Sequence, residues 1–418
     1  MPNPPSRSTQ TADERRAPRP RPKALSNPTS VVNQYLEAQY PADAARALCS
    51  LGITLHHQGN LHEAAAKLRE AVELQSTDEL RADRAWTLHA LAAVLRDQDN
   101  VSEALKLLLL ALELHGESES VHGQARAHTQ LGQIYLRVGH IDLAENALRT
   151  AQQEHSATGD NRGTAWTLTQ LARVQLARDE AATAVAELND ALARHRENED
   201  AWGETWTLYY LGQAQEEAGD TDAAVRSLER SRTMFSRMRD VYGLACARHH
   251  SGRVIRDQHA RLGGNLRNSG YARQLLQDAR LDFRRIGVPR SEAWSCVELA
   301  VIDAGNDRIP KALELVEEAG RLFAGIGDRH GQDWARFLRC TLLPLISEEG
   351  AAAARDDITA LLSEGDNDRD PDLAEHVAAW SLILQRVIAP WSPWEVWRLG
   401  MTPHRSSRER MALREAAG

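Results

Sequence analysis

Few side chains in this sequence have the types and spacing that a chemical site requires. Two histidine pairs, His56-His57 and His249-His250, could offer imidazoles to a metal ion, but neighbours on a helix diverge by about 100° and do not meet one ion easily. No HExxH zinc motif and no GxSxG nucleophile motif occurs. The segment GGNLRNSG, residues 263 to 270, lacks the GK[ST] ending of a phosphate-binding loop. We therefore expect no catalytic residue, no metal ligand and no cofactor.

The cysteines and the apolar runs indicate a reducing, aqueous compartment. Cys49, Cys246, Cys296 and Cys340 lie far apart without a CxxC pair, which predicts neither a disulfide framework nor a zinc site. The Pro- and Arg-rich N-terminus has no apolar stretch of the kind that a secretory signal needs. The most apolar run, residues 104 to 114, is far shorter than the roughly 20 residues of a membrane span. We expect a cytoplasmic protein without a membrane segment.

Charge is distributed unevenly along the 418 residues. Residues 1 to 30 carry six Lys or Arg against two acids, and residues 398 to 418 carry five Arg against two acids. The residues between them carry a net charge of −16 within a total of −9. Basic arms can contact nucleic acid, but an Arg- and Pro-rich tail is more often solvated, and we do not expect nucleic-acid binding. Residues 1–30 are predicted to be a disordered leader and residues 401–418 a basic helix or tail.

A repeat of forty residues organises the chain from about residue 31 to residue 365. One series of leucines keeps this interval without interruption: Leu51, Leu91, Leu131, Leu171 and Leu211. A series of alanines does the same: Ala64, Ala104, Ala144, Ala184 and Ala224. Each alanine is followed four residues later by a leucine and three further on by Ala or Ser, which is helical spacing. Breakers such as Gly59-Asn60 and Gly139-His140 separate the two series, so each unit is predicted to be a helical hairpin.

The forty-residue interval is broken once, and the repeat array is predicted to end in a capping helix. After Leu211 the leucine series resumes at Leu299, which indicates an eight-residue insertion in the sixth unit near residues 259–270. We expect residues 366–400 to hold a capping helix, from Asp372 to Ile388, because the last hairpin of a stack otherwise exposes its apolar face. The three tryptophans of PWSPWEVW, residues 390 to 397, either fold back over this cap or form a docking motif.

These residues resemble the tetratricopeptide signature. The clearest copy places Leu131-Gly132, Tyr135, Ala144, Leu148 and Ala151 at the offsets of that repeat, although the unit here is forty residues long and lacks the usual closing proline. With its GDRxGxAW phrase the unit is similar to the C-terminal repeat arrays of AfsR-like and maltose-activator-like signal-transduction ATPases with numerous domains. The resemblance implies an all-α, right-handed superhelix of about seven or eight hairpins. It also implies regulation through binding of a partner or ligand.

A tryptophan stands at the second position of five first helices, as in GTAWTLTQLARV, residues 163 to 174. At about 100° per residue, that position lies roughly 130° from the core face of the helix. First helices line the concave side of a helical stack, so we expect a groove there with aromatic and hydrogen-bonding side chains. Its candidate partner-binding residues are Trp86, Trp166, Trp206, Trp294, Trp334, His89, Tyr209, His249, Arg96, Gln133, Arg173, Gln213, Arg253 and Arg256. The alternative is that each tryptophan packs into the seam between its helix and the preceding hairpin.

The function predicted from the sequence is a non-catalytic module that recognises a protein or peptide segment in its concave groove. Arginines such as Arg173 favour an acidic or C-terminal segment, because a guanidinium binds a carboxylate with two parallel hydrogen bonds. Two alternatives stay open at this point. One is an enzyme, or an enzyme accessory that holds a substrate chain for modification; the other is the sensor portion of a transcription regulator whose ATPase is encoded separately.

Overall fold

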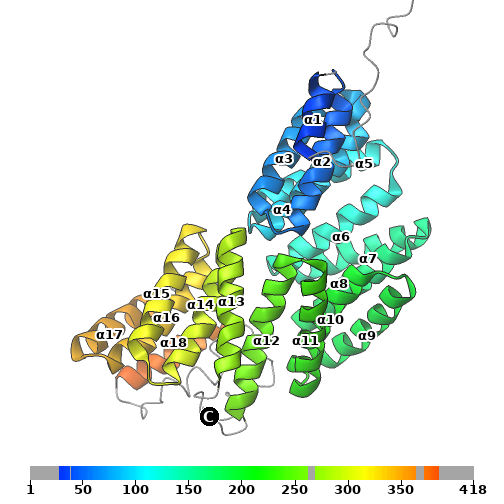
Figure 1. Ribbon diagram of the computed structural model, residues 1–418. Coiled ribbons are helices and arrows are strands. Elements are labelled where there is room, and N and C mark those ends of the chain that lie inside the picture. Colours follow the sequence, from blue (N-terminus) through cyan, green and yellow to red (C-terminus); the bar gives the residue numbers. More distant parts are fainter. Residues whose placement is uncertain (1–27, 38, 262–268, 364–370, 386–418) are drawn as a thin grey trace, which may run out of the picture.

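The computed structural model describes residues 28–37, 39–261, 269–363 and 371–385, and every regular element within them is helical (Figure 1). The α-helices are α1 (Pro28–Glu37), α2 (Pro41–His57), α3 (Leu61–Leu74), α4 (Arg81–Asp97), α5 (Val101–Glu117), α6 (Val121–Arg137), α7 (Ile141–Thr158), α8 (Asn161–Ala177), α9 (Ala181–Glu197), α10 (Ala201–Glu217), α11 (Thr221–Met238), α12 (Val241–Arg261), α13 (Gly270–Ile286), α14 (Pro289–Ala304), α15 (Ile309–Gly325), α16 (Arg329–Leu342), α17 (Glu348–Ser363) and α18 (Pro371–Leu384). Short 3-10 turns at Asp78–Leu80 and Leu343–Leu345 complete the described secondary structure.

Consecutive helices pack in antiparallel pairs, which makes the protein an all-α solenoid. From α2–α3 to α16–α17 the described residues form eight hairpins, and each hairpin packs on the next. The alanine series and the leucine four residues after each alanine provide the contacts: Ala64 and Leu68, like their counterparts forty residues apart, have no exposed surface. A glycine on the facing helix permits the close approach, since a methyl group at Gly132 would overlap the side chain of Leu148. The fold class and the hairpin repeat predicted from the sequence are confirmed.

The breakers in the sequence coincide with left-handed backbone at the turns. Within the described residues, a residue with positive φ follows the first helix of six hairpins: Gly59, Asp99, Gly139, Asp179, Gly219 and Asp307. A second positive-φ residue, such as Gly159 or Gly327, stands between several hairpins and their successors. Glycine adopts this conformation without steric cost, and aspartate tolerates it better than most residues. The alternation of Gly and Asp at one repeat position therefore has a single structural reason.

The array curves until its first hairpins touch its sixth and seventh (Figure 1). At the α2–α3 turn, a Cβ added to Gly59 would stand 3.0 Å from Ile286 Cγ2 and 3.2 Å from Val241 Cβ. Arg290, at the start of α14, lies 3.6 Å from Asp99 in the α4–α5 turn and 3.2 Å from Asp328. One apolar core cluster accordingly contains residues of α2 to α6 together with residues of α12 and α13. We call the resulting arrangement of α2 to α14 the ring.

Helix α18 covers the end of the array. Leu373, Val377 and Trp380 are buried in the same cluster as residues of α16 and α17. The indole N–H of Trp380 donates to the carbonyl oxygen of Cys340 at 3.3 Å. These contacts remove the apolar face of the last hairpin from water, which is what a terminal helix must do in a stack.

Several predictions fall outside the described residues. They concern most of the leader 1–30, the centre of the insertion at 262–268, the tryptophans of residues 390–397 and the tail 401–418. In the part of the chain that the structure covers, no helix is both long enough and apolar enough to cross a bilayer.

Candidate functional site

The concave side of the ring holds a chamber of about 380 Å³. Its walls come from α2, α4, α6, α8, α10 and α12, with Asp240 just before α12. These are the first helices of six successive hairpins, so one repeat position after another contributes a side chain to the same space. Ligand pockets in proteins typically enclose about 300–1,000 Å³, and the chamber falls within that range.

Aromatic rings from α8, α10 and α12 form one wall of the chamber. The ring centroids of Trp166 and Trp202 lie 4.8 Å apart, and Trp206 meets Tyr209 edge-on at 5.5 Å. Trp206 is only 8% exposed, and its indole N–H has no hydrogen-bond partner within the described residues. A buried donor without an acceptor costs about 1–3 kcal/mol. An acceptor on a bound molecule would therefore be stabilised at Trp206.

Three arginines reach the chamber, and two of them are neutralised. Arg96 lies 2.9 Å from Asp97, and Arg137 pairs with Asp99. Arg173 has no carboxylate partner within the described residues. Its guanidinium lies 4.4 Å from the ring centroid of Tyr210 and donates to Gln170 Oε1 at 2.6 Å. Stacking on a ring leaves the edge of a guanidinium free to donate to a further acceptor.

Burial and neighbouring charges set the protonation states in the chamber. Burial opposes ionisation of Asp97, but Arg96 and His56 outweigh it and hold the pKa of this carboxyl well below its usual range. Burial raises the pKa of Asp240 and raises the pKa of Tyr242 well above its usual value. The phenols are thus neutral and the Asp97 charge is already paired, which leaves Arg173 beside the aromatic wall without a carboxylate partner in the described residues, while Asp240 lines the same chamber.

Comparison with known families identifies the repeat. Tetratricopeptide-repeat family models match residues 83–153 and, separately, residues 45–70, 165–190 and 205–230. The chain contains tetratricopeptide repeats. The matched segments fall on the first five hairpins, from α2 to α11. Among curated proteins, none matches the sequence.

Two solved structures show the same arrangement of tetratricopeptide hairpins. One is a Rap protein complexed with competence and sporulation factor: it is 13% identical, with a TM-score of 0.55 over 83% of this chain and 99% of that chain. The other is a signal-transduction ATPase with numerous domains (STAND) from Pyrococcus horikoshii that carries a tetratricopeptide-repeat sensor. It is 14% identical, with a TM-score of 0.55 over 84% of this chain and 53% of that chain. This chain therefore spans about half the length of the STAND protein.

Seven of the fourteen candidate residues from the repeat analysis line the chamber, and seven do not. Those that line it are Arg96, Gln133, Trp166, Arg173, Trp206, Tyr209 and Gln213. Trp86 lies instead beside a separate depression of about 320 Å³ between α2 and α4. The half-buried ring of His89 lies beside Trp86, and the centroids of these two rings are 5.9 Å apart.

The five tryptophans of the repeat lie in seams, and the expectation of rings open to solvent in a groove is corrected for three of them. Trp206, Trp294 and Trp334 are 8%, 9% and 1% exposed. Four of the rings meet the second helix of their own hairpin, the start of the next hairpin, or both: Trp166 contacts Trp202 of α10, and Trp294 lies 4.9 Å from Phe323 of α15. Trp334 lies beside His376 of α18, with ring centroids 6.1 Å apart. The seam is thus with the following hairpin rather than the preceding one. Trp166 and Trp206 both pack in a seam and line the chamber.

Three polar candidates in α12 are buried in ion pairs or hydrogen bonds away from the chamber. Arg256 has no exposed surface and pairs with Glu298 and Asp257, and Arg253 pairs with Glu216. His249 Nδ1 and Ser295 Oγ are hydrogen-bonded at 3.0 Å, and burial lowers the pKa of the His249 imidazole to about 4. The projection of a single helix placed these side chains on the groove side. Their partners on other helices, Glu298 and Ser295 of α14 and Glu216 of α10, lay outside that projection.

Nine residues that line the chamber were not predicted from the sequence. They are His56, His57, Asp97, Arg137, Trp202, Tyr210, Asp240, Tyr242 and Cys246. Two signals could have found some of them. Trp202 stands four residues before Trp206 and so shares its helix face. His57, Asp97 and Arg137 recur at intervals of forty, at the repeat position directly after that of the candidate Arg96.

A second constellation repeats in the seams between hairpins. In α9, His195 Nδ1 is hydrogen-bonded to Asp200 Oδ2 at 2.8 Å, and its Nε2 lies 3.4 Å from Thr169 Oγ1. The order of groups is that of an Asp-His-hydroxyl triad, in which the hydroxyl is a nucleophile. Here Thr169 has no exposed surface and donates to the carbonyl of Ala165 at 3.2 Å. The network satisfies buried polar groups and presents no hydroxyl to a substrate.

Proposed function

We propose that the chain is a non-catalytic regulatory module that binds a peptide or protein segment in the chamber. One observation carries the proposal: Arg173, without a carboxylate partner in the described residues, and the unpaired indole N–H of Trp206 belong to the same aromatic-walled space. A half-buried cation without a carboxylate partner and a buried donor without an acceptor are both costly until a ligand supplies acceptors.

The chemistry of the walls favours a segment with a free carboxylate next to a large apolar side chain. A carboxylate would accept two parallel hydrogen bonds from Arg173, and an aromatic or branched side chain would fill the space between Trp166 and Trp206. A backbone carbonyl of the ligand would accept from Trp206. About 380 Å³ accommodates the end of a peptide rather than a whole folded partner.

The structural relatives support a binding role without fixing the ligand. The Rap protein of similar fold was solved in complex with competence and sporulation factor, and the repeats of the STAND protein are described as a sensor. Both descriptions agree with our proposal that this stack of hairpins recognises another molecule on its inner face. The buried hydroxyls of the Asp-His-Thr networks argue against hydrolysis as the role of the chain.

The proposal is tested with a library of short random peptides, presented once with free C-termini and once as C-terminal amides. The full chain is expected to select free-acid peptides that end in a large apolar residue. Trp206→Phe, which keeps the ring but removes the N–H, should weaken a selected peptide by about tenfold, because one hydrogen bond to a buried donor is lost.

The matched control for charge is Arg178→Gln. Arg178 follows α8, as Arg173 lies within it, but it is paired with Asp142 and Glu145 outside the chamber. This variant should bind the selected peptide as the wild type does. The assignment of the site would be refuted if free-acid and amidated peptides were selected equally. It would also be refuted if Arg178→Gln and Arg173→Gln lost the same affinity for the selected peptide.

A sensor that acts with a separately encoded ATPase is the second candidate function. The chain spans about half of the Pyrococcus STAND protein, whose repeats form its sensor. This role uses the same chamber and adds a protein partner. Co-purification of an ATPase with the full chain, lost on addition of the selected peptide, would support it; a chain that purifies alone in the presence and absence of peptide would count against it.

A further inference from the structure

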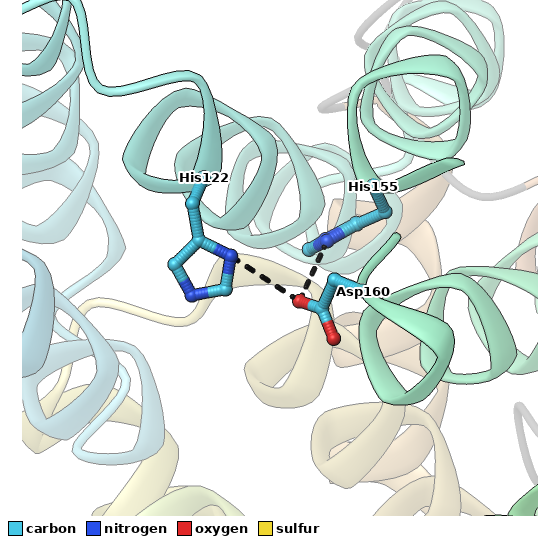
Figure 2. Close-up of side chains that lie close together, drawn as sticks. All are labelled: His122, His155 and Asp160. Atoms are coloured by element: carbon cyan, nitrogen blue, oxygen red, sulfur yellow. Dashed lines mark ion pairs between the residues drawn. The ribbon is translucent and has the colours of Figure 1, made fainter. Parts of the chain in front are cut away.

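We propose that His122, His155 and Asp160 bind one divalent transition-metal ion, for which Zn²⁺ is the best match, at the seam between the third and fourth hairpins. Figure 2 shows the three side chains converging from three places in the fold. His122 belongs to the first turn of α6, His155 to the last turn of α7, and Asp160 immediately precedes α8. No short motif contains them, so the sequence led us to expect no metal ligand.

The separations suit one small ion. Asp160 Oδ2 lies 3.0 Å from His155 Nδ1 and 3.4 Å from His122 Nδ1, and the three ligand atoms all lie within 4.8 Å of one another. Ligands of a tetrahedral zinc ion at about 2.0–2.1 Å stand roughly 3.3 Å apart. Two of the three separations already have about this length. His122 is exposed, with 45% of its side-chain surface accessible, and its ring can therefore turn to shorten the third.

The hydrogen bonds around His155 hold its Nδ1 toward Asp160. The hydroxyl of Thr129 donates to the carbonyl of Ala125 at 2.9 Å, so at its 3.2 Å contact with His155 Nε2 it acts as the acceptor. Nε2 is then the ring nitrogen that donates to threonine, as Nε2 of His195 does to Thr169 in the next seam, and the two seams differ in the contact that Nδ1 makes. The short contact between Nδ1 and Asp160 Oδ2 lacks hydrogen-bond geometry, and both atoms are buried without a hydrogen-bond partner in the described residues. A metal ion between them would give each of these two atoms a bonding partner.

The surrounding hydrogen bonds have the form of an outer shell of a metal site. A ligating histidine commonly donates its other ring N–H to a fixed acceptor, as His155 does to Thr129. Asp160 is held in place by its other oxygen, which accepts from the backbone N–H of Gly163 at 2.9 Å. His155 is 1% exposed and cannot swing out to water.

The next seam provides a comparison within the same molecule. Forty residues after His122, His155 and Asp160 stand Arg162, His195 and Asp200. There the histidine makes an ordinary hydrogen bond to the carboxylate at 2.8 Å. The seam that has a third ligand is the one in which this hydrogen bond is absent.

The ligand set favours an ion that accepts imidazole. Two neutral nitrogens and one carboxylate match Zn²⁺ and leave a fourth position, on the exposed side of His122, for water. Ca²⁺ and Mg²⁺ prefer sets made of oxygen atoms. Burial opposes ionisation of Asp160, but the backbone N–H of Gly163 and nearby charges, Arg126 among them, lower the pKa of its carboxyl. Arg126, whose guanidinium lies 5.9 Å from the Trp86 ring centroid, is the nearby cation that opposes metal binding.

The test uses the full chain, freed of metal with a chelator and titrated with ZnCl₂ in a calorimeter. We expect one tight site per chain, and Co²⁺ in its place should give a visible absorption spectrum with nitrogen and oxygen ligands. His122→Gln should weaken zinc binding by more than about tenfold, since loss of even an outer-shell group costs that much. Because His122 is exposed, this variant keeps the fold.

Two further variants of the same helix complete the experiment. His128→Gln removes a histidine that pairs with Glu154 at 2.8 Å outside the cluster, and should leave zinc affinity unchanged. Arg126→Gln removes the opposing charge and should tighten binding. The proposal is overturned if the wild type binds no Zn²⁺, or if His122→Gln binds it as tightly as His128→Gln does. Either result would make the three side chains a polar contact of the seam.

Discussion

The seams between hairpins are built in two ways, and the two halves of the molecule differ in which one they use. At one repeat position near the end of the second helix, α5, α7 and α9 carry histidines, whereas α11, α13 and α15 carry phenylalanines. These residues are His115, His155, His195, Phe235, Phe283 and Phe323, and none is more than 2% exposed. We refer to the two groups as the histidine seams and the phenylalanine seams. All six rings thus occupy equivalent places between layers.

The difference shows that one backbone accepts either apolar packing or a polar network. In both kinds of seam the ring lies against the start of the next hairpin, where a glycine such as Gly203 or Gly331 leaves room for it. The phenylalanines gain from burial alone. The histidines need partners, and Asp200 and Thr169 provide them for His195. The histidine seams are therefore where the array can hold a proton or a metal ion, while the phenylalanine seams only stabilise it.

The largest effect is expected from emptying a phenylalanine seam. Phe323→Ala should lower the free energy of unfolding by about 3–5 kcal/mol, because a buried ring beside Trp294 is replaced by a cavity. Urea denaturation followed by circular dichroism measures it. Leu281→Ala, at a leucine of α13 that is 60% exposed, is the control and should change stability little. Equal losses in the two variants would mean that the seam does not carry the stability assigned to it.

A second test asks whether the two kinds of seam share one steric requirement. Gly203→Ala and Gly331→Ala would each drive a methyl group into a ring, His195 in the first case and Phe323 in the second. Each should cost about 1–3 kcal/mol in thermal or urea unfolding. The control is Gly116→Ala, where the nearest atom would be 3.7 Å away and stability should hold or rise slightly. If only one of the two glycine substitutions lowered the stability, the two kinds of seam would not share this steric requirement.

A third test converts one seam into the other. His195→Phe keeps a ring of similar shape but deprives the Asp200 carboxylate and the Thr169 hydroxyl of their partner, at a net cost of about 1 kcal/mol. Adding Thr169→Val should recover part of that loss, and the non-additivity of the double variant measures the network. If His195→Phe proves more stable than the wild type, the hydrogen bonds of this seam contribute nothing to the fold.

The smallest expected effect is a change in pH dependence. Burial, with His122 as a nearby second cause, lowers the pKa of His115 below its ordinary value of 6.5. The neutral imidazole is thus the form that suits the fold, and its stability is present above about pH 6.5 and is lost as the pH falls toward the folded-state pKa. His115→Phe should therefore lose less stability than the wild type between pH 7 and pH 5, as followed by thermal unfolding. An unchanged pH profile would contradict the assignment.

The repeat could be predicted from the sequence because it depends on local spacing. The interval of forty, the Ala and Leu series and the Gly or Asp at the turns each concern residues within one hairpin or between neighbours. The chamber depends on more distant relations. Arg290 meets Asp99 across 191 positions of the sequence, and this closure of the ring brings α2 and α12 to one space.

The placement of the tryptophans shows the same limit on a smaller scale. A helical projection gives the angle of Trp294 about its own axis, but Phe323 and the start of α16 decide that this ring is covered. The candidates that do line the chamber, such as Arg173 and Trp206, come from the central repeats, around which the ring closes. Trp334 lies toward the end of the array, and Trp86 lies at the start of α4, whose other end contributes Arg96 to the chamber.

The central claim, that the chamber binds a carboxylate through Arg173, is tested most directly by a double cycle. One selected peptide is measured as free acid and as amide against the wild type and Arg173→Gln, with Arg178→Gln in parallel. If the claim holds, amidation weakens binding to the wild type and to Arg178→Gln but hardly affects Arg173→Gln, with a coupling of about 1.5–3 kcal/mol. Additive losses, with amidation equally costly in all three proteins, would show that the carboxylate does not bind at Arg173.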